Sequence, residues 1–147
     1  MEIKTLLKLL NDHKVRYVII GGMAVIAHGW ARLTQDIDIF VEPAQSNIEN
    51  LFRALQKSGY DLSEVTVEEA LHKKLLFRGY LLRTDIHPFV TGIDFETVWK
   101  NKVQYSFQGQ NVYFAALDDL IEMKKAAGRP QDIEDLRHLE EIKRQKK

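Results

Sequence analysis

Two aspartates that lie one residue apart, Asp36 and Asp38 in "QDIDIF", are the side chains of this sequence most suited to chemistry. On a β-strand, residues i and i+2 point to the same face, so both carboxylates would project together while Ile37 and Ile39 face the core. Adjacent carboxylates repel each other and raise each other's pKa unless a cation lies between them. Mg²⁺ suits such a pair, because it takes one or two protein carboxylates and completes its shell with water and substrate phosphates. For this pair alone, a solvated strand face that repeats aspartate is the alternative.

A pair of glycines, Gly21 and Gly22, follows the apolar run "YVII" and precedes a short apolar segment. Glycine lets a phosphate approach the main chain closely, and backbone N–H groups at the start of a helix can meet an anion. The dinucleotide-binding pattern GxGxxG would need glycine at two positions that hold Met23 and Ile26, and the GK[ST] of a Walker loop is missing. A purely structural turn is the alternative, but it leaves the aspartates unexplained.

The spacing of these residues, "GG...A...HG..R.T.DIDI", resembles the core signature of the DNA polymerase beta–like nucleotidyltransferase superfamily. In that superfamily a Gly-Gly or Gly-Ser pair is followed by Asp-h-Asp-h, where h is hydrophobic. The form found here is most similar to bacterial AbiEii-type and related small nucleotidyltransferases, including toxin–antitoxin members, and is also similar to aminoglycoside and lincosamide nucleotidyltransferases. The resemblance covers residues 15–42. It implies a nucleotidyltransferase fold and metal-dependent transfer of a nucleotide.

The superfamily resemblance implies a third carboxylate on a neighbouring strand, and Asp85 in "LLRTDIHPF" is the candidate. A second stretch, "LIEMKKAAGRPQDIEDL", resembles the C-terminal element of AbiEii-like proteins and implies that Lys124 and Asp132 belong to the active site, with Arg129 and Asp135 as further candidates. Each has an alternative: Asp85 as an exposed strand acid, Lys124 as a solvated lysine. An acid at position 132 is also favoured by the dipole of a helix first turn.

Two more residues flank the aspartate pair and are expected to contact the triphosphate: Arg32, with its bidentate fork, and Thr34. A loop arginine and a turn threonine are the alternatives. The side-chain hydroxyl of Gly-Ser members is missing here, but the backbone donors remain. The five histidines show no metal-ligand spacing, and His28 and His87 are expected to form structural hydrogen bonds.

The elements that must position these residues follow from periodicity and from turn residues. Helices are expected over residues 2–14, 22–29, 45–59, 66–74, 94–101, 117–128 and 130–147, and strands over residues 15–21, 36–42, 74–80, 81–89, 103–107 and 111–115. The order of the elements predicts an α/β or α+β domain. Together with the resemblance it predicts a nucleotidyltransferase fold, with a small mixed β-sheet flanked by helices and followed by C-terminal helices. Residues 1–147 are expected to form one domain, with the catalytic core at 15–115 and a C-terminal helical element at 116–147.

Composition limits the partners of the protein. Lys plus Arg equals Asp plus Glu, at 21 each, which argues against nonspecific binding of duplex nucleic acid, although a local basic groove would survive the cancellation. The lack of cysteine excludes disulfides and thiolate zinc sites and fits a cytoplasmic protein. The N-terminus does not resemble a signal peptide, and no apolar run approaches the ~20 residues that span a bilayer.

The predicted reaction is transfer of a nucleoside monophosphate from an NTP to an acceptor hydroxyl, with release of pyrophosphate. Asp36 and Asp38 would bind Mg²⁺ (or Mn²⁺), and Asp85 would help to hold a second ion and orient the attacking hydroxyl. Gly21 and Gly22 would receive phosphate oxygens, with Lys124 as counter-charge. The acceptor stays open between an RNA end such as that of tRNA, a protein hydroxyl and a small molecule. An antitoxin or partner-binding module and an NTP-binding regulator without turnover are the alternatives, and the sequence does not indicate an oligomeric state.

Overall fold

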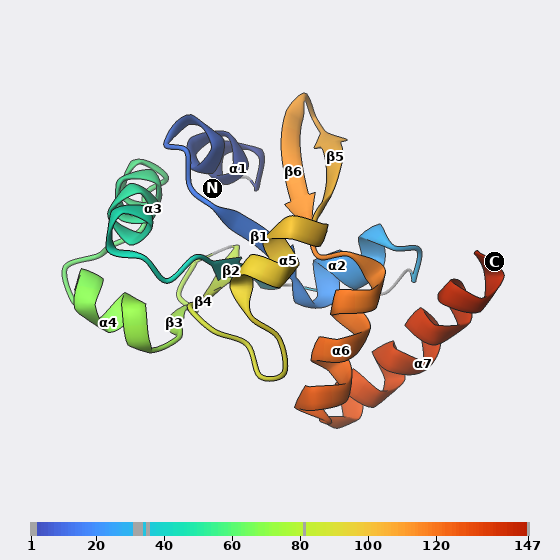
Figure 1. The fold of residues 1–147 in the computed structure, drawn as a ribbon. Coiled ribbons are helices and arrows are strands. Elements are labelled where there is room, and N and C mark those ends of the chain that lie inside the picture. Colours follow the sequence, from blue (N-terminus) through green and yellow to red (C-terminus); the bar gives the residue numbers. More distant parts are fainter. Residues whose placement is uncertain (1–2, 31–33, 35, 81, 147) are drawn as a thin grey trace.

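A mixed β-sheet lies at the centre of the fold (Figure 1). The computed structural model describes residues 3–30, 34, 36–80 and 82–146. Within them the strands are β1 (Tyr17–Ile20), β2 (Asp36–Val41), β3 (Leu75–Phe77), β4 (Arg83–His87), β5 (Val103–Phe107) and β6 (Gln110–Phe114), and the helices are α1 (Ile3–Asp12), α2 (Gly21–Ala27), α3 (Gln45–Lys57), α4 (Val67–His72), α5 (Phe95–Asn101), α6 (Leu117–Ala127) and α7 (Pro130–Gln145). The strand order is β3-β4-β2-β1-β6-β5. The expected mixed sheet flanked by helices is confirmed.

The middle of the sheet consists of β4, β2 and β1. β2 runs parallel to β4 and antiparallel to β1, and the register places Asp38 opposite Asp85 on one side and opposite Ile20 on the other. Two aspartates from distant parts of the sequence therefore lie side by side on neighbouring strands. The predicted hairpin near Gly79 also forms, as β3 paired antiparallel to β4.

The alternation of side chains along β2 divides the core between the two faces of the sheet. Ile37, Ile39 and Val41 are fully buried in a cluster shared with α1 and α3. Phe40 belongs to a second cluster, shared with α2, α5 and α6. Since successive residues of a strand face opposite sides, Asp36 and Asp38 lie on the Phe40 side of the sheet. The isoleucines hold the strand in place while the aspartates face the C-terminal helices.

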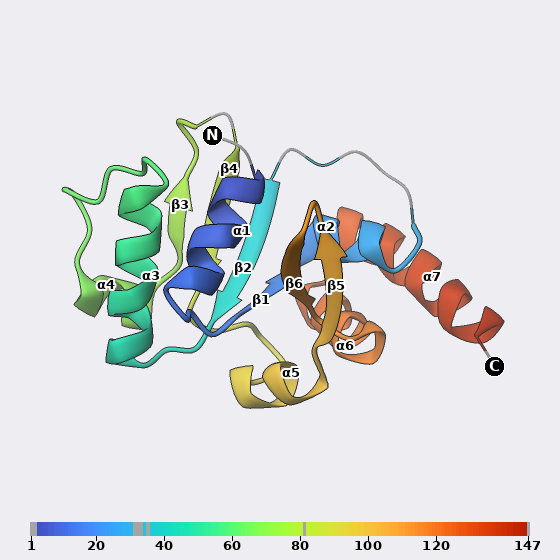
Figure 2. The same cartoon turned by 90° about the horizontal axis from the view of Figure 1, so that it is seen from above.

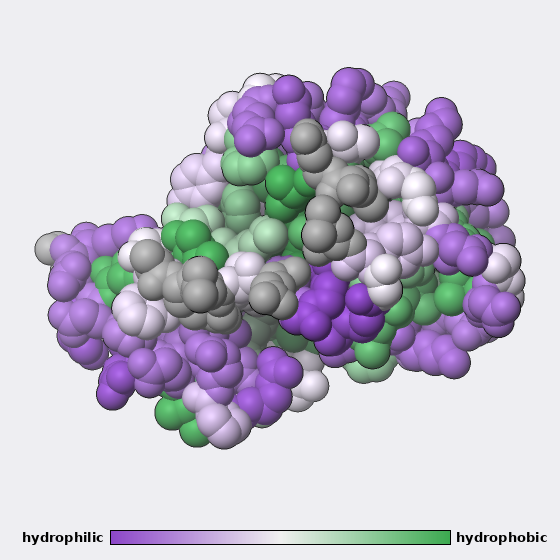
Figure 3. All heavy atoms as spheres, turned by 180° about the vertical axis from the view of Figure 1, so that it is seen from behind, coloured by the Kyte–Doolittle hydropathy of each residue, from purple (hydrophilic) through white to green (hydrophobic). Residues whose placement is uncertain are grey.

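The helices cover both faces of the sheet, with α1 and α3 against one face and α2, α5 and α6 against the other. Figures 1 and 2 place α3 and α4 at one end of the molecule and α6 and α7 at the other. The view from behind shows hydrophobic patches that lie between hydrophilic side chains (Figure 3). None of the helices described is both long and apolar enough to pass through a membrane.

Most expected elements differ from the observed ones by a few residues at their ends. The strand expected from residue 74 is shorter, Leu75–Phe77, and Arg78 follows it in the turn. The helix expected from residue 66 begins as predicted, because the side chain of Thr66 accepts a hydrogen bond from the backbone of Glu69. The helix expected to stop at Gly128 does so, since Gly128 takes a left-handed conformation with φ of 66°. The turn after Gly128 sets α6 and α7 against each other.

Candidate active site

A cleft of about 690 Å³ opens where the start of α2, strands β2 and β4, and the joint between α6 and α7 come together. Most of the predicted site residues that the structure describes line it, and they are Gly21, Gly22, Thr34, Asp36, Asp38, Asp85, Lys124, Arg129 and Asp132. Asp135, a further candidate, is fully buried and does not line the cleft. Arg32 lies outside the described residues. The fold thus brings together the chemically suggestive positions of the N-terminal half and those of the C-terminal helices.

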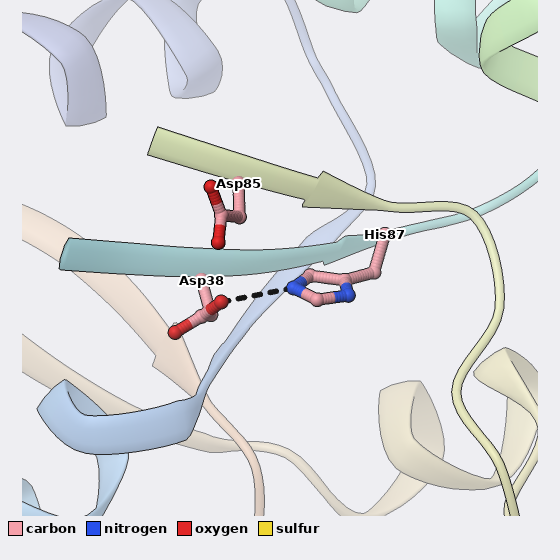
Figure 4. A group of neighbouring side chains, drawn as sticks. All are labelled: Asp38, Asp85 and His87. Carbon is pink, nitrogen blue, oxygen red and sulfur yellow. Dashed lines mark hydrogen bonds and ion pairs between the residues drawn. The ribbon is translucent and has the colours of Figure 1, made fainter. Parts of the chain in front are cut away.

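Asp38, Asp85 and His87 form a close group of potential metal ligands in this cleft (Figure 4). One ligand atom from each side chain lies within 4.8 Å of the others, which is close enough for a shared metal ion. The Nε2 atom of His87 lies 2.9 Å from Oδ1 of Asp38. Asp85 is buried, whereas Asp38 and His87 are only partly covered. The group therefore combines two carboxylates with an imidazole at a point that the cleft reaches.

Gly21 allows the carboxylate of Asp38 to lie close against the main chain. The backbone of Gly21 has a φ of +70°, which L side chains rarely adopt, and a Cβ atom built there would lie 2.4 Å from Oδ2 of Asp38. Both the conformation and the close approach exclude a larger residue. Gly22, the next residue, is buried at the start of α2. The glycine pair thus keeps the main chain in contact with the carboxylate that the cleft exposes.

Asp36 faces the same cleft as Asp38 but lies outside the close group. Nε of Arg83 lies 2.8 Å from Oδ1 of Asp36, an ion pair whose angles do not meet those of a hydrogen bond. The hydroxyl of Thr34 is engaged with the backbone of Asp36, at 3.3 Å from its carbonyl oxygen and 3.4 Å from its nitrogen. Thr34 therefore shapes the entry to β2 and lines the cleft as well.

The carboxylate of Asp85 is held by Arg78. Nε and Nη2 of Arg78 donate to the two carboxylate oxygens of Asp85 at 3.0 Å and 2.9 Å. These hydrogen bonds, and then the charge of Asp85, raise the pKa of Arg78, and the charges of Asp36 and Asp38 act in the same direction. The guanidinium groups of Arg83 at Asp36 and of Arg78 at Asp85 thus offset part of the repulsion between the three aspartates of β2 and β4.

At the α6–α7 joint, Lys124 is almost fully buried between two aspartates. Its Nζ lies 3.1 Å from Oδ1 of Asp132 and 2.9 Å from Oδ2 of Asp135. Nε of Arg129 lies 2.6 Å from Oδ2 of Asp132. Burial acts to raise the pKa of Asp132, but the hydrogen bonds from Arg129 and Lys124 outweigh it and hold that pKa below its usual value. This cluster forms one wall of the cleft.

The sequence analysis gave no binding role to two residues of this cleft. It expected His87 to form a structural hydrogen bond, which the structure shows with Asp38, and it did not consider Arg78. A signal for His87 was present, because residues 85 and 87 share one strand face by the same i, i+2 rule that linked the two aspartates of β2. No such signal marked Arg78, since its contact with Asp85 depends on how the β3–β4 turn folds back.

Residues 1–145 match the protein family described as "Nucleotidyltransferase of unknown function (DUF6036)". The chain belongs to this nucleotidyltransferase family. A search of curated proteins finds no match. The family assignment agrees with the predicted superfamily, and the narrower resemblance to AbiEii-type proteins stays a prediction.

Two solved structures share the fold of this nucleotidyltransferase family member. The lincosamide antibiotic adenylyltransferase LnuA, solved with lincomycin bound, is 19% identical with a TM-score of 0.65, and the match covers 97% of this chain and 98% of LnuA. A candidate nucleotidyltransferase from Thermotoga maritima is 18% identical with a TM-score of 0.62, and the match covers 92% of this chain and 88% of that protein. At such identities the likeness shows the fold alone.

Proposed function

We propose that the protein is a metal-dependent enzyme that transfers a nucleoside monophosphate from an NTP to an acceptor hydroxyl and releases pyrophosphate. The observation that carries this proposal is the pairing of Asp38 with Asp85 on neighbouring strands, beside Gly21, in a cleft of a nucleotidyltransferase family member. In-line transfer of a phosphoryl group needs charge stabilisation and positioning more than covalent chemistry from the protein. This cleft has the acidic residues for both tasks.

The donor atoms fit a hard divalent cation such as Mg²⁺ or Mn²⁺, because both ions favour carboxylate oxygens. Asp38 and Asp85 would be the ligands, with Asp36 on the same face as a further carboxylate. His87 would orient Asp38 through its 2.9 Å contact, as groups hydrogen-bonded to metal ligands do. The ion would supply charge stabilisation to the attacking and leaving oxygens.

The other residues of the cleft divide the remaining tasks. Gly21 and Gly22 would receive phosphate oxygens at the main chain, since both residues line the cleft and carry no side chain. Asp85 would also orient the attacking hydroxyl. Lys124 and Asp132 would face the nucleotide from the opposite wall, with the charge of Lys124 already shared between Asp132 and Asp135.

The acceptor is proposed to be a small molecule, an RNA end or a protein hydroxyl. LnuA, which has the same fold, is named for transfer of an adenylyl group to a lincosamide antibiotic. Small hydroxyl compounds therefore belong in the first acceptor panel, beside total RNA and a protein lysate. The cytoplasm, where NTP and Mg²⁺ are abundant, is the proposed compartment.

The test is transfer of label from each α-³²P-labelled NTP with Mg²⁺ or Mn²⁺ to these acceptor pools. Asp38→Ala is expected to lower transfer by at least about a hundredfold, as loss of transition-state charge stabilisation does. Asp12→Ala is the matched control, because Asp12 is an aspartate of α1 that pairs with Lys8 far from the cleft. Equal transfer by wild type and Asp38→Ala would refute the assignment. Metal-dependent NTP binding without transfer to any acceptor would favour a regulator, and a stable hetero-complex from cells would favour an antitoxin.

A further inference from the structure

The guanidinium of Arg78 is hydrogen-bonded to the carboxylate of Asp85, which a metal ion in this cleft would need as a ligand. Both oxygens of Asp85 accept a hydrogen bond from Arg78, one from Nε and one from Nη2. A metal ion at the group of Asp38, Asp85 and His87 requires one of those oxygens. Each of those oxygens has a second lone pair, so a metal ion could bind beside Arg78, but the two positive charges would then lie close together and repel each other. The Arg78–Asp85 pair therefore competes with metal binding at Asp85.

Asp85 needs a cation in either state. It is only 4% exposed, and an ionised carboxylate buried to that degree is costly unless it is paired and hydrogen-bonded. Arg78 satisfies this need in the metal-free protein. When a metal ion binds Asp85, the ion supplies the positive charge that the carboxylate needs, and Arg78 is no longer required for it.

Of the basic residues paired with the three aspartates, Arg78 is the one outside the sheet. Arg83 and His87 belong to β4, where the register with β2 fixes their backbone. Arg78 follows the last residue of β3, and its side chain is 48% exposed. It can leave Asp85 by rotating its side chain, without breaking a ladder hydrogen bond.

The cleft offers the released guanidinium a second partner. Arg78 lines the same cleft as Gly21 and Gly22, where the proposed function places the triphosphate. A planar guanidinium pairs with phosphate in the same bidentate manner as with carboxylate. The exchange would therefore replace one bidentate anion by another.

We propose that Arg78 is a nucleotide-binding residue that covers Asp85 in the metal-free protein and moves to the phosphates of the NTP when Asp85 takes up metal. This inference rests on the proposed function. In the transfer step, Arg78 would stabilise the negative charge that develops on the departing pyrophosphate. No covalent bond to Arg78 forms or breaks.

The first half of the test measures Mn²⁺ binding without nucleotide, by electron paramagnetic resonance of the free ion. Arg78→Gln is expected to bind Mn²⁺ about fivefold more tightly than wild type, because a half-exposed bidentate pair no longer competes. Lys74→Gln is the matched control: it removes a cation from the same cleft, and Lys74 makes no ion pair with Asp85 among the residues described. An affinity in Arg78→Gln that is unchanged, weaker, or raised no more than in Lys74→Gln overturns the inference.

The second half measures equilibrium binding of α,β-methylene analogues of the four NTPs at saturating Mn²⁺. Arg78→Gln is expected to bind the preferred analogue about tenfold more weakly, since a charge-assisted contact to phosphate is lost. Arg78→Lys keeps the positive charge without the planar guanidinium, and its affinity for the analogue is expected to lie between those of wild type and Arg78→Gln. Unchanged analogue affinity in Arg78→Gln overturns the proposed move to phosphate.

Failure of this inference is distinguishable from failure of the proposed function. Wild-type protein that transfers label while Arg78→Gln behaves like wild type in both binding assays refutes the role of Arg78 alone. Folded wild-type protein that binds neither Mn²⁺ nor any analogue refutes both. Circular dichroism of each variant confirms that the binding measurements compare folded proteins.

Discussion

The cleft is bordered by two clusters of acidic and basic side chains that differ in how far water reaches them. In the first, the Asp38–His87 and Asp85–Arg78 pairs lie at the cleft, and Arg78 is about half exposed. In the second, Lys124 lies between Asp132 and Asp135, and these three side chains are at most 8% exposed, while Arg129, which also pairs with Asp132, is 74% exposed. The same residue types thus meet in two environments.

The difference decides what each cluster can do. Ion pairs in contact with water are weak, so a metal ion or a phosphate can replace one partner. In a buried cluster the loss of one partner leaves an uncompensated charge in a medium of low polarity. We therefore interpret the β2–β4 cluster as the one that exchanges partners and the α6–α7 cluster as the one that holds the wall of the cleft.

The largest effect is expected from Asp135→Ala. It would leave the buried ammonium of Lys124 with Asp132 alone and lower the free energy of unfolding by about 3 kcal/mol. Urea denaturation measures this change, and Glu141→Ala on the exposed face of the same helix is the control. If stability is unchanged but nucleotide binding is lost, the α6–α7 cluster binds the nucleotide instead of stabilising the cleft wall, and the proposed difference between the two clusters is wrong.

A smaller effect is expected from Gly21→Ala, which adds a Cβ against Oδ2 of Asp38. Displacing that carboxylate is expected to weaken Mn²⁺ binding about tenfold, as disturbing the surroundings of a metal ligand does. Gly109→Ala is the matched control, because its φ of +84° imposes the same backbone strain while nothing lies within 4 Å of the new atom. If both variants bind Mn²⁺ like wild type, the close approach of residue 21 has no bearing on the site.

The smallest effect concerns pH. The pKa of Asp132 is lower in the folded protein than in the unfolded chain. Its ionised form therefore contributes stability that is present above the unfolded pKa of about 3.9 and is lost as the pH falls through the folded value. Urea denaturation between pH 6 and pH 3 should show a shallower loss of stability in Asp132→Asn than in wild type. Parallel curves would mean that Asp132 does not contribute to the acid sensitivity of the fold.

Much of the local structure could be predicted, because it depends on short-range chemistry. The helix after Gly128, the capping role of Thr66 and the strand that carries Asp36 and Asp38 follow from turn residues, caps and alternation. Strand ends were less predictable, as at β3, because the length of a strand depends on the partner with which it pairs. The predicted α/β class was confirmed because it follows from the order of these local elements along the chain.

The partners of the site residues could not be predicted in the same way. Lys124 could be solvated or buried by sequence alone, and only the packing of α6 against α7 encloses it between two aspartates. Arg78 reaches Asp85 because β3 turns back onto β4. Such contacts depend on long-range pairing, whereas the sequence pattern of either segment reports only its own backbone.

By itself, the sequence determined that Asp36 and Asp38 share a strand face and that a glycine pair precedes them, since both facts follow from spacing and residue type. The tertiary structure decided that β4 lies beside β2 in parallel register, which brings Asp85 and His87 to Asp38. It also decided which charges meet water and which do not. Burial is a property of the assembled fold, and burial sets whether an ion pair can exchange its partner or must keep it.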